Sequence, residues 1–434
     1  MNKFIILIIL IFLQSCSLDT KSGIWTKKQK IITEEKEGNI KNLFKKDVIL
    51  EKELNPSLKI ELEGRLIKDS FTDNQNNNKG RLDYDGNLKS ISKFKFSKIK
   101  NFKLLEPEIL SNNNSLIFHD DEGTLIKFDT TSKVIWKKNH YSKLEKKSKP
   151  ILFFNNDNNI LIVADSLSKY YAINIKNGNL LWSKINAAPF NSQIKIYKDK
   201  FFVIDFDNIL RCFSVKNGKE LWKIKTGNTF IKSEKKLSIT IANSIVYFNN
   251  SIGDISAVDI ESGSLLWQTP TQNESIYQDS FFLKVSDLIT DGKSIVFSNN
   301  KNEFYSLDSE SGLINWKQSI NSNLTSTLIN ELIFSISNEG YLIIINNKTG
   351  NIIRITDLLD SFKRKKRLKI NPVGFFVGKS NIYLTTDNGK LLVVEIKTGK
   401  TKSILKIDNE KISRPFVLNQ NLYIIKKSSI VKLN

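Results

Sequence analysis

The sequence predicts an all-β fold, an eight-bladed β-propeller of four-stranded blades, and three observations lead to it. Seven times along the 434 residues an apolar strand runs into a polar turn, and in five copies a Trp follows the last turn residue by four positions. The strands are short and rich in β-branched residues, without long helical periodicity. The copies recur every 38 to 49 residues, which is typical of propeller blades; their turn residues are Ser132, Gly178, Gly218, Gly263, Gly312, Gly350 and Gly399.

Each residue type in the repeat has a physical role. The clearest copies span 172–182 and 257–267. We expect the Gly to supply a positive φ in the turn before the outer strand, and the Asp or Asn four positions earlier to bond the turn backbone. The Trp is expected to pack between neighbouring blades. These predicted blade-packing residues are Trp136, Trp182, Trp222, Trp267 and Trp316, while two later copies have Arg354 and Ser403 at this position.

The blade count depends on the end of the chain. Only 35 residues follow Gly399, and they hold the outer strand of blade seven and then three more strands. An eighth blade would therefore lack its outer strand, which the alternating segment 91–99 ahead of blade one can supply. Pairing the two ends of the propeller would also remove exposed sheet edges. We predict eight blades closed in this way, with seven as the alternative.

The first sixteen residues predict export. Lys3 precedes an apolar stretch of about ten residues at 4–13, too short for a membrane span of roughly 20. The residues before Cys16 resemble a bacterial lipobox, in which this Cys is lipidated, and Ser17 then implies the outer membrane. Ordinary signal cleavage beside a chance Cys is the alternative.

The domain organisation follows from these features. We expect a lipoprotein signal peptide at 1–15, a flexible tether and N-terminal extension at 16–88, and the propeller at 89–434. The alternating residues at 58–62 could form one extra strand within the extension.

The net charge of +21 raises the question of nucleic-acid binding. Lysines are spread over every blade and aromatic residues occupy strand positions, so no nucleic-acid partner is expected. The densest basic run, at 363–367, lies between blades six and seven. It has two interpretations: a solvated loop, or a contact for acidic lipid headgroups or an acidic partner.

The residues that usually carry chemistry are sparse. Beyond Cys16 the chain has one further cysteine, Cys212, which is expected to be a buried thiol. His119 and His140 are the only histidines and lie in no Cys/His/Asp cluster. We therefore predict a protein that is not an enzyme, with no catalytic residues, no metal site and no cofactor.

The repeat resembles that of two families with different functions. Pyrroloquinoline-quinone dehydrogenases share it, but most carry a vicinal Cys pair that this sequence lacks, and the setting of Asp287 and Asp291 does not indicate a calcium site. The BamB family of the outer-membrane β-barrel assembly machinery is similar over nearly the whole chain. This resemblance implies a non-enzymatic scaffold lipoprotein of the outer membrane that faces the periplasm. Its partners would be a BamA-like barrel assembly protein and unfolded outer-membrane proteins.

The resemblance also implies a partner-binding loop. In the BamB family a Leu-x-Leu-Arg loop entering the fourth blade contacts the partner, and the corresponding stretch here is 229–234. The implied partner-binding residues are Phe230, Ile231, Lys232 and Glu234, although Lys lacks the planar geometry of Arg. An ordinary interblade loop is the alternative, and Asp279 is the nearest candidate for a second, acidic contact. A glycan-binding propeller using Tyr277, Phe281 and Phe282 is a third functional hypothesis.

Overall fold

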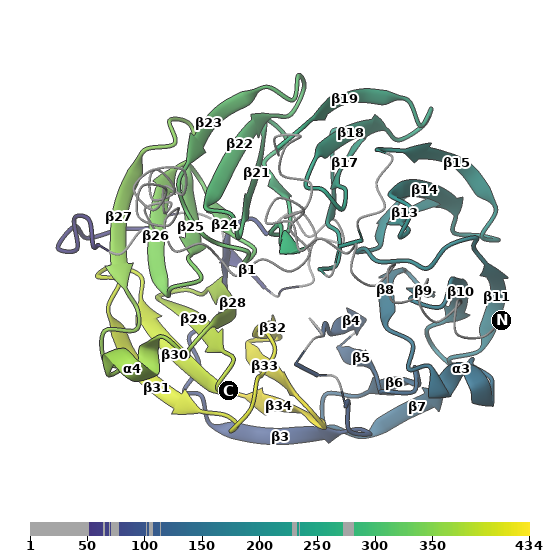
Figure 1. Ribbon diagram of the computed structural model, residues 1–434. Coiled ribbons are helices and arrows are strands. Elements are labelled where there is room, and N and C mark those ends of the chain that lie inside the picture. Colours follow the sequence, from purple (N-terminus) through teal and green to yellow (C-terminus); the bar gives the residue numbers. More distant parts are fainter. Residues whose placement is uncertain are drawn as a thin grey trace, which may run out of the picture. The chain divides into compact units, whose positions relative to one another are not determined.

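The computed structural model describes residues 52–63, 66–68, 70, 78–100, 102–103, 107–112, 114–227, 232–233, 235–271 and 282–434. These residues belong to one compact unit that spans 49–434. In them, strands form eight four-stranded antiparallel sheets arranged as a ring (Figure 1), which confirms the predicted eight-bladed propeller.

The first seven blades each run in chain order from the inner to the outer strand. Blade one is β4 (Leu110–Asn112), β5 (Ser115–His119), β6 (Leu125–Phe128) and β7 (Val134–Lys138). Blade two is β8 (Leu152–Asp157), β9 (Ile160–Asp165), β10 (Lys169–Asn174) and β11 (Leu180–Ile185). Blade three is β12 (Lys195–Tyr197), β13 (Lys200–Ile204), β14 (Ile209–Ser214) and β15 (Glu220–Lys225). Blade four is β16 (Ile239–Ala242), β17 (Ile245–Asn249), β18 (Ile255–Asp259) and β19 (Leu265–Thr269).

The later blades repeat this order. Blade five is β20 (Ile289–Thr290), β21 (Ser294–Asn299), β22 (Glu303–Asp308) and β23 (Ile314–Gln318). Blade six is β24 (Thr327–Ile329), β25 (Leu332–Ile336), β26 (Tyr341–Asn346) and β27 (Ile352–Asp357). Blade seven is β28 (Pro372–Val377), β29 (Asn381–Thr386), β30 (Lys390–Glu395) and β31 (Thr401–Lys406). Outside the blades lie a short parallel pair, β1 (Leu66–Ile67) with β2 (Arg81–Leu82), and two short helices, α3 (Lys143–Lys147) and α4 (Arg364–Arg367).

Blade eight joins the two ends of the propeller. It contains β32 (Phe416–Leu418), β33 (Asn421–Lys426) and β34 (Ser429–Leu433), and its outer strand is β3 (Ser90–Lys95). β3 pairs antiparallel with β34, with Phe94 opposite Ile430. Phe94 is fully buried and its ring lies edge-on to that of Phe128 in blade one, 5.5 Å between centroids. The predicted donor of the missing strand is thus confirmed.

Burial follows position within a blade. The third strand of blade six, β26, is buried along almost its whole length, because both of its faces pack against neighbouring blades. The outer strand of blade two, β11, is largely exposed. Apolar clusters accordingly form between blades rather than within one, as where blades six and seven share one core.

The repeat Trp residues join consecutive blades. Each indole N–H donates to a backbone carbonyl of the next blade, three residues before that blade's turn Gly. The turn glycines have positive φ, as predicted. At Gly350 (φ 73°) a Cβ atom would lie only 2.5 Å from the Trp316 ring, so this position requires Gly. The bonds are Trp136 to Ile175 (3.1 Å), Trp182 to Val215 (3.0 Å), Trp222 to Ile260 (3.0 Å), Trp267 to Ser309 (3.1 Å) and Trp316 to Asn347 (2.7 Å).

Arg354 occupies the Trp position between blades six and seven. Its side chain is fully buried, and Nη2 donates to the Ile396 carbonyl at 2.9 Å, the site equivalent to the Trp acceptors. Nη1 donates to the carbonyl oxygens of Lys397 (2.7 Å) and Leu58 (2.9 Å). Burial lowers the pKa of this guanidinium to about 10.

The Leu58 carbonyl belongs to segment 52–63, the start of the described chain. Leu54 pairs with Ile355 of β27, and the Ile60 amide donates to the Lys397 carbonyl at 3.0 Å. Ile60 is buried in the core shared by blades six and seven. The strand suggested at 58–62 is not present, because this backbone bonds to Arg354 and to the Lys397 carbonyl instead of to a sheet edge.

Candidate functional site

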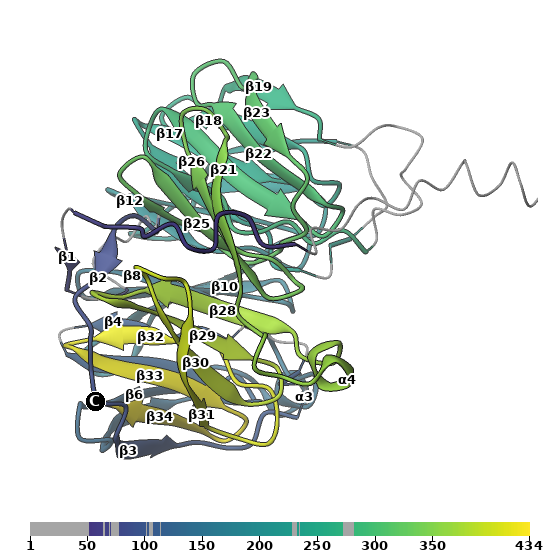
Figure 2. The same cartoon turned by 90° about the vertical axis from the view of Figure 1, so that its left-hand side faces the viewer.

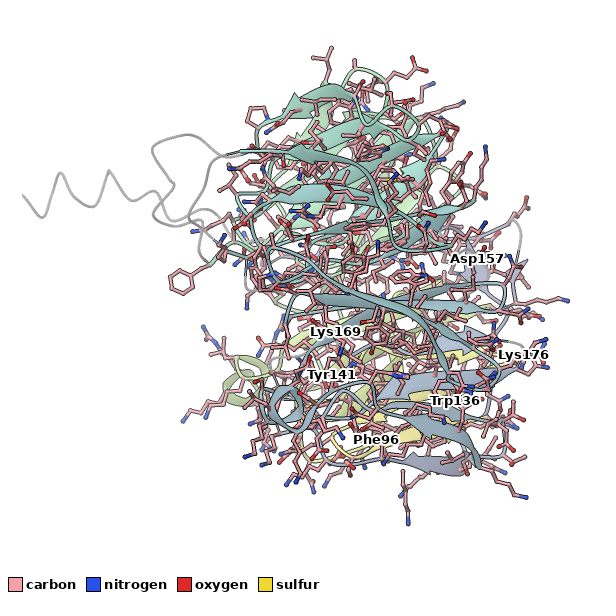
Figure 3. All side chains as sticks on the ribbon, turned by 90° about the vertical axis from the view of Figure 1, so that its right-hand side faces the viewer. Phe96, Trp136, Tyr141, Asp157, Lys169 and Lys176 are labelled. Atoms are coloured by element: carbon pink, nitrogen blue, oxygen red, sulfur yellow. The ribbon has the colours of Figure 1, made fainter. Side chains whose placement is uncertain are left out.

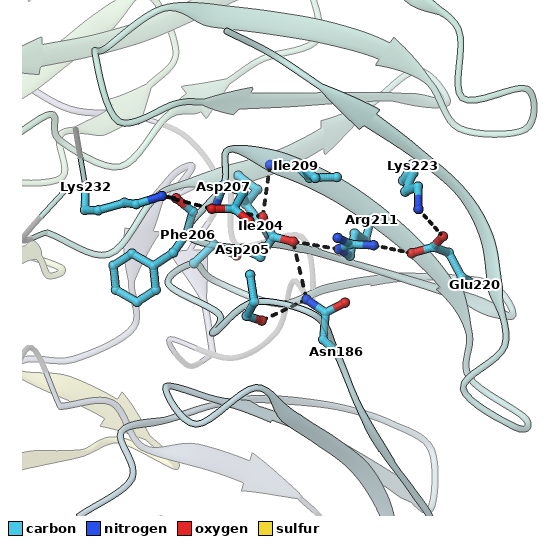
Figure 4. A network of polar contacts seen from close by, with 12 residues as sticks. Asn186, Ile204, Asp205, Phe206, Asp207, Ile209, Arg211, Glu220, Lys223 and Lys232 are labelled. Carbon is cyan, nitrogen blue, oxygen red and sulfur yellow. Dashed lines mark hydrogen bonds and ion pairs between the residues drawn. The ribbon is translucent and has the colours of Figure 1, made fainter. Parts of the chain in front are cut away.

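Lys232 lies in the connection from β15 of blade three to β16 of blade four, where the partner-binding loop was expected. Its ammonium donates to the Phe206 carbonyl at 2.5 Å and lies 3.0 Å from an Asp207 carboxylate oxygen (Figure 4). Phe206 and Asp207 belong to the turn between β13 and β14. The other expected contact residues, Phe230, Ile231 and Glu234, lie outside the described residues, as do Cys16, Tyr277, Asp279 and Phe281.

A buried ionic network holds this turn in place. Asp205 is fully buried, and its carboxylate accepts bonds from the Ile209 amide (3.2 Å) and from Arg211 Nε (2.7 Å). Arg211 also donates to Glu220 at 2.5 Å. Burial disfavours the charge on Arg211, yet these two carboxylates raise its pKa. Because Arg211 bonds to a carboxylate on each side, the network fixes the turn that presents Phe206 and Asp207.

The Lys232 ion pair itself is accessible. Its side chain is 41% exposed and that of Asp207 is 55% exposed. An exposed pair of this kind contributes only about 0–1 kcal/mol, so a partner can exchange it for its own contacts at small cost. A cation bonded to a fixed turn, beside a partly buried Phe206, is suited to docking a partner surface.

A second polar cluster lies in a cavity of about 1940 Å³, which residues ahead of several inner strands line. Glu108 accepts from Lys236 (2.8 Å) and Arg414 (3.2 Å). Asp287 accepts from the Thr325 hydroxyl at 2.9 Å. These residues come from the entries of blades one, four, five, six and eight, so the cluster links segments far apart in the chain.

Neighbouring cations lower the pKa of both carboxylates in this cluster. We call it the axial cluster; its members are Glu108, Lys235, Lys236, Asp287, Thr325 and Arg414. Burial opposes ionisation of Asp287, but Lys235, Lys236 and Arg414 lower its pKa to about 2. Burial likewise opposes ionisation of Glu108, and Lys236 with Arg414 lowers its pKa. One carboxylate oxygen of Asp287 is buried without a hydrogen-bond partner. Ion pairs thus line part of the cavity inside the ring.

Sequence reasoning missed the axial cluster, although a signal for it exists. Glu108, Asp287 and Arg414 each stand two residues before the first strand of a blade. All three line the same cavity, so charged residues just ahead of the first strands were the available signal.

Residues considered for chemistry lie apart from both clusters. Cys212 is fully buried in β14, and burial raises the pKa of its thiol to about 12. His119 is buried with Nδ1 3.2 Å from the Asp120 carbonyl oxygen, and burial lowers its pKa. His140 Nε2 lies 3.2 Å from the Gly178 carbonyl oxygen. Among the described residues, no group of three or more His, Cys, Asp or Glu side chains is placed to hold a metal ion.

The chain is similar to known proteins in sequence. A family model described as "Outer membrane protein assembly factor BamB" matches residues 121–356. The BamB of Legionella pneumophila (strain Paris) is 25% identical over 210 residues, which are 46% of this chain and 50% of that protein. The BamB of Shewanella oneidensis is 23% identical over 256 residues, 55% of this chain and 59% of that protein. The chain thus spans between half and two thirds of the length of these relatives.

Solved structures share the fold. BamB from Moraxella catarrhalis superposes with a TM-score of 0.65 at 13% identity, covering 80% of this chain and 99% of that one. The quinohemoprotein alcohol dehydrogenase from Comamonas testosteroni gives 0.62 at 10% identity, covering 84% of this chain and 80% of that one. At these low sequence identities, the structural similarity supports the propeller fold and no further shared property. The family model covers more than half of the chain, and the chain therefore belongs to the family of the outer membrane protein assembly factor BamB.

Proposed function

We propose that this chain is a non-enzymatic scaffold lipoprotein of the outer-membrane β-barrel assembly machinery. It docks on the periplasmic domains of a BamA-like protein and assists the folding and insertion of outer-membrane proteins. Membership of the BamB family carries this proposal. In it, residues 1–15 are a signal peptide, Cys16 carries the lipid anchor, and 16–88 link the anchor to the propeller on the periplasmic side.

The docking element in this proposal is the connection into blade four together with the turn beneath it. The Lys232 ammonium bonds to the Phe206 carbonyl, and the buried Asp205–Arg211 pair holds the turn that contains Phe206. Ile231 precedes Lys232 in the sequence and would supply an apolar anchor beside the cation. Such a pairing of an apolar anchor with a flanking charge is common at interface hot spots.

Co-purification tests the proposal. The tagged full chain is recovered from gently solubilised outer membranes and its partners are identified by mass spectrometry. We expect a BamA-like barrel protein with the wild type and its loss with Ile231→Asp, because burying a carboxylate in an apolar contact costs roughly several kcal/mol. Lys232→Glu should also reduce recovery, because it places a carboxylate beside Asp207.

Lys176→Glu is the matched control, since Lys176 is an exposed lysine in a turn of blade two, and it should retain the partner. Circular dichroism checks that every variant is folded. If the wild type recovers no barrel protein, the scaffold proposal fails. If all variants recover it equally, the docking element lies elsewhere.

A further inference from the structure

Two short helices project from the same side of the ring. α3 lies between blades one and two, and α4 lies between blades six and seven. Figure 2 shows both helices on one side of the propeller. In Figure 3, Tyr141 and Lys169, which lie beside α3, are on that side of blade two, whereas Lys176 is on the opposite side. The reason is topological: antiparallel strands place every connection from an outer to an inner strand on one face, which we call the connection face.

Each helix carries an exposed leucine among exposed lysines. Leu144 of α3 is 76% exposed, and Leu368, which follows α4, is 81% exposed. These values are among the highest for large apolar residues of the described chain. The cations around them form no ion pair within the described residues. Lys146 is half-buried, and the others are exposed; they are Lys143, Lys147, Lys363, Arg364, Lys365, Lys366 and Lys369.

The residues that fix these helices are held on the ring side. Glu145 of α3 closes a capping box with Ser142 and lies 3.5 Å from Lys169 of β10. Arg367 of α4 pairs with Asp357 and lies over the Tyr341 ring, 5.2 Å from its centroid. The basic run at 363–367, which could have been a solvated loop, therefore includes an anchored helical turn that leaves four of its five cations exposed.

We propose that the connection face, at α3 and α4, rests on a bilayer rich in acidic phospholipids. The lysines and arginines contact headgroup phosphates, and Leu144 and Leu368 enter the interface. This goes beyond the scaffold role, which requires no lipid contact by the propeller itself. The two leucines sit on separate connections instead of forming one apolar patch, so a broad, flat surface meets both, whereas a protein partner commonly requires a contiguous patch.

The start of the described chain lies beside this surface. Glu53 accepts a bond from the Asp357 amide at 3.0 Å, and Arg367 of α4 pairs with the carboxylate of the same residue. One residue of blade six thus holds both α4 and the N-terminal extension. With a lipid on Cys16, as proposed above, the extension would meet the ring next to α4.

Environment-sensitive fluorophores test the contact. Leu144→Cys and Leu368→Cys full-length proteins are labelled with a nitrobenzoxadiazole dye and reconstituted into vesicles. Native Cys212 should stay unlabelled because it is buried with a raised thiol pKa, and Cys16 should stay unlabelled because its thiol carries the proposed lipid. With phosphatidylcholine–phosphatidylglycerol vesicles we expect a blue shift and brighter emission at both positions. Leu313→Cys is the matched control, because Leu313 is 71% exposed but lies in the turn ahead of β23, on the opposite face.

Charge reversal gives a second arm. Lys365→Glu/Lys366→Glu should abolish the shift at position 368, whereas Lys216→Glu/Lys219→Glu, the same charge change in an opposite-face turn, should preserve it. Equal spectra at all three dye positions would overturn the proposal, as would the same shift on phosphatidylcholine alone. The same shift with soluble polyglutamate and no vesicles would reassign the surface to an acidic protein. Partner co-purification is read separately, so a failure here is distinct from a failure of the scaffold role.

Discussion

Two neighbouring contacts between blades use the same backbone acceptor position with different donors. We call them the Trp joint, between blades five and six, and the Arg joint, between blades six and seven. Trp316 donates to the Asn347 carbonyl and Arg354 to the Ile396 carbonyl, each three residues before a turn Gly. The Trp joint is complete within two blades. The Arg joint also needs the Leu58 carbonyl, which lies 296 residues away in sequence. A repeat position can therefore accept a cation when a segment outside the repeat supplies further acceptors.

The two joints also differ in their electrostatics. Burying an indole gains apolar contact and needs one acceptor, whereas burying a guanidinium loses hydration that carbonyl dipoles must replace. Arg354 bonds to three backbone carbonyls and to no carboxylate among the described residues, and its lowered pKa reflects that burial. The Arg joint should thus be the more sensitive of the two to loss of its side chain.

The largest expected effect is at Arg354. Arg354→Ala would leave a cavity and remove the donor that the Leu58, Lys397 and Ile396 carbonyls share, so we expect the free energy of unfolding to fall by about 3–5 kcal/mol. Urea titration followed by Trp fluorescence measures it. Ser403→Ala, at the exposed equivalent position in blade seven, is the control and should change stability by no more than about 0.5 kcal/mol. A loss below about 1 kcal/mol for Arg354→Ala would contradict this view of the joint.

An intermediate effect on the free energy of unfolding is expected when the turn glycine of each joint is replaced by Ala. Gly350 and Gly399 share nearly the same positive φ, 73° and 70°, so Ala suffers similar backbone strain at both. At Gly350 the new Cβ meets the body of the Trp316 indole, whereas at Gly399 it meets the ends of the Thr356 and Arg354 side chains. We expect Gly350→Ala to cost about 2–3 kcal/mol and Gly399→Ala about 1 kcal/mol in the same titration. The reverse order would show that the Arg joint is the tighter one.

The last effect concerns low pH and is comparable in size to that of Gly399→Ala. Asp287 in the axial cluster has its pKa lowered to about 2, so its contribution to stability is present above its unfolded pKa of about 4 and lost as pH falls toward 2. We expect a loss of about 1–2 kcal/mol over this range that Asp287→Asn removes. The bonds of Arg354 among the described residues go to backbone carbonyls, which do not titrate, so Arg354→Ala should cost the same at pH 7 and pH 3. Parallel pH profiles for wild type and Asp287→Asn would contradict the assignment.

The sequence was sufficient for the blades and for their closure, because both follow from counting strands against a repeat. It was insufficient for the contacts between repeat residues and segments outside the repeat. The Leu58 carbonyl has no side-chain signature, so nothing at 58–62 indicates a bond to Arg354. Lys232 was located from a resemblance, but the Asp205–Arg211 pair that supports its turn involves contacts between strands and connections that spacing alone does not reveal.

The pairing of β3 with β34 has a consequence for the timing of folding. The two strands lie at opposite ends of the propeller sequence, so blade eight cannot be completed until the last strand, β34, has been synthesised. Such distant pairing makes ring closure intrinsically slow, because the chain must first bring its remote segments together. Until β3 and β34 pair, the propeller is an open array in which β3 has no partner and β34 has an unpaired edge, exposed to proteases and to other unfolded chains.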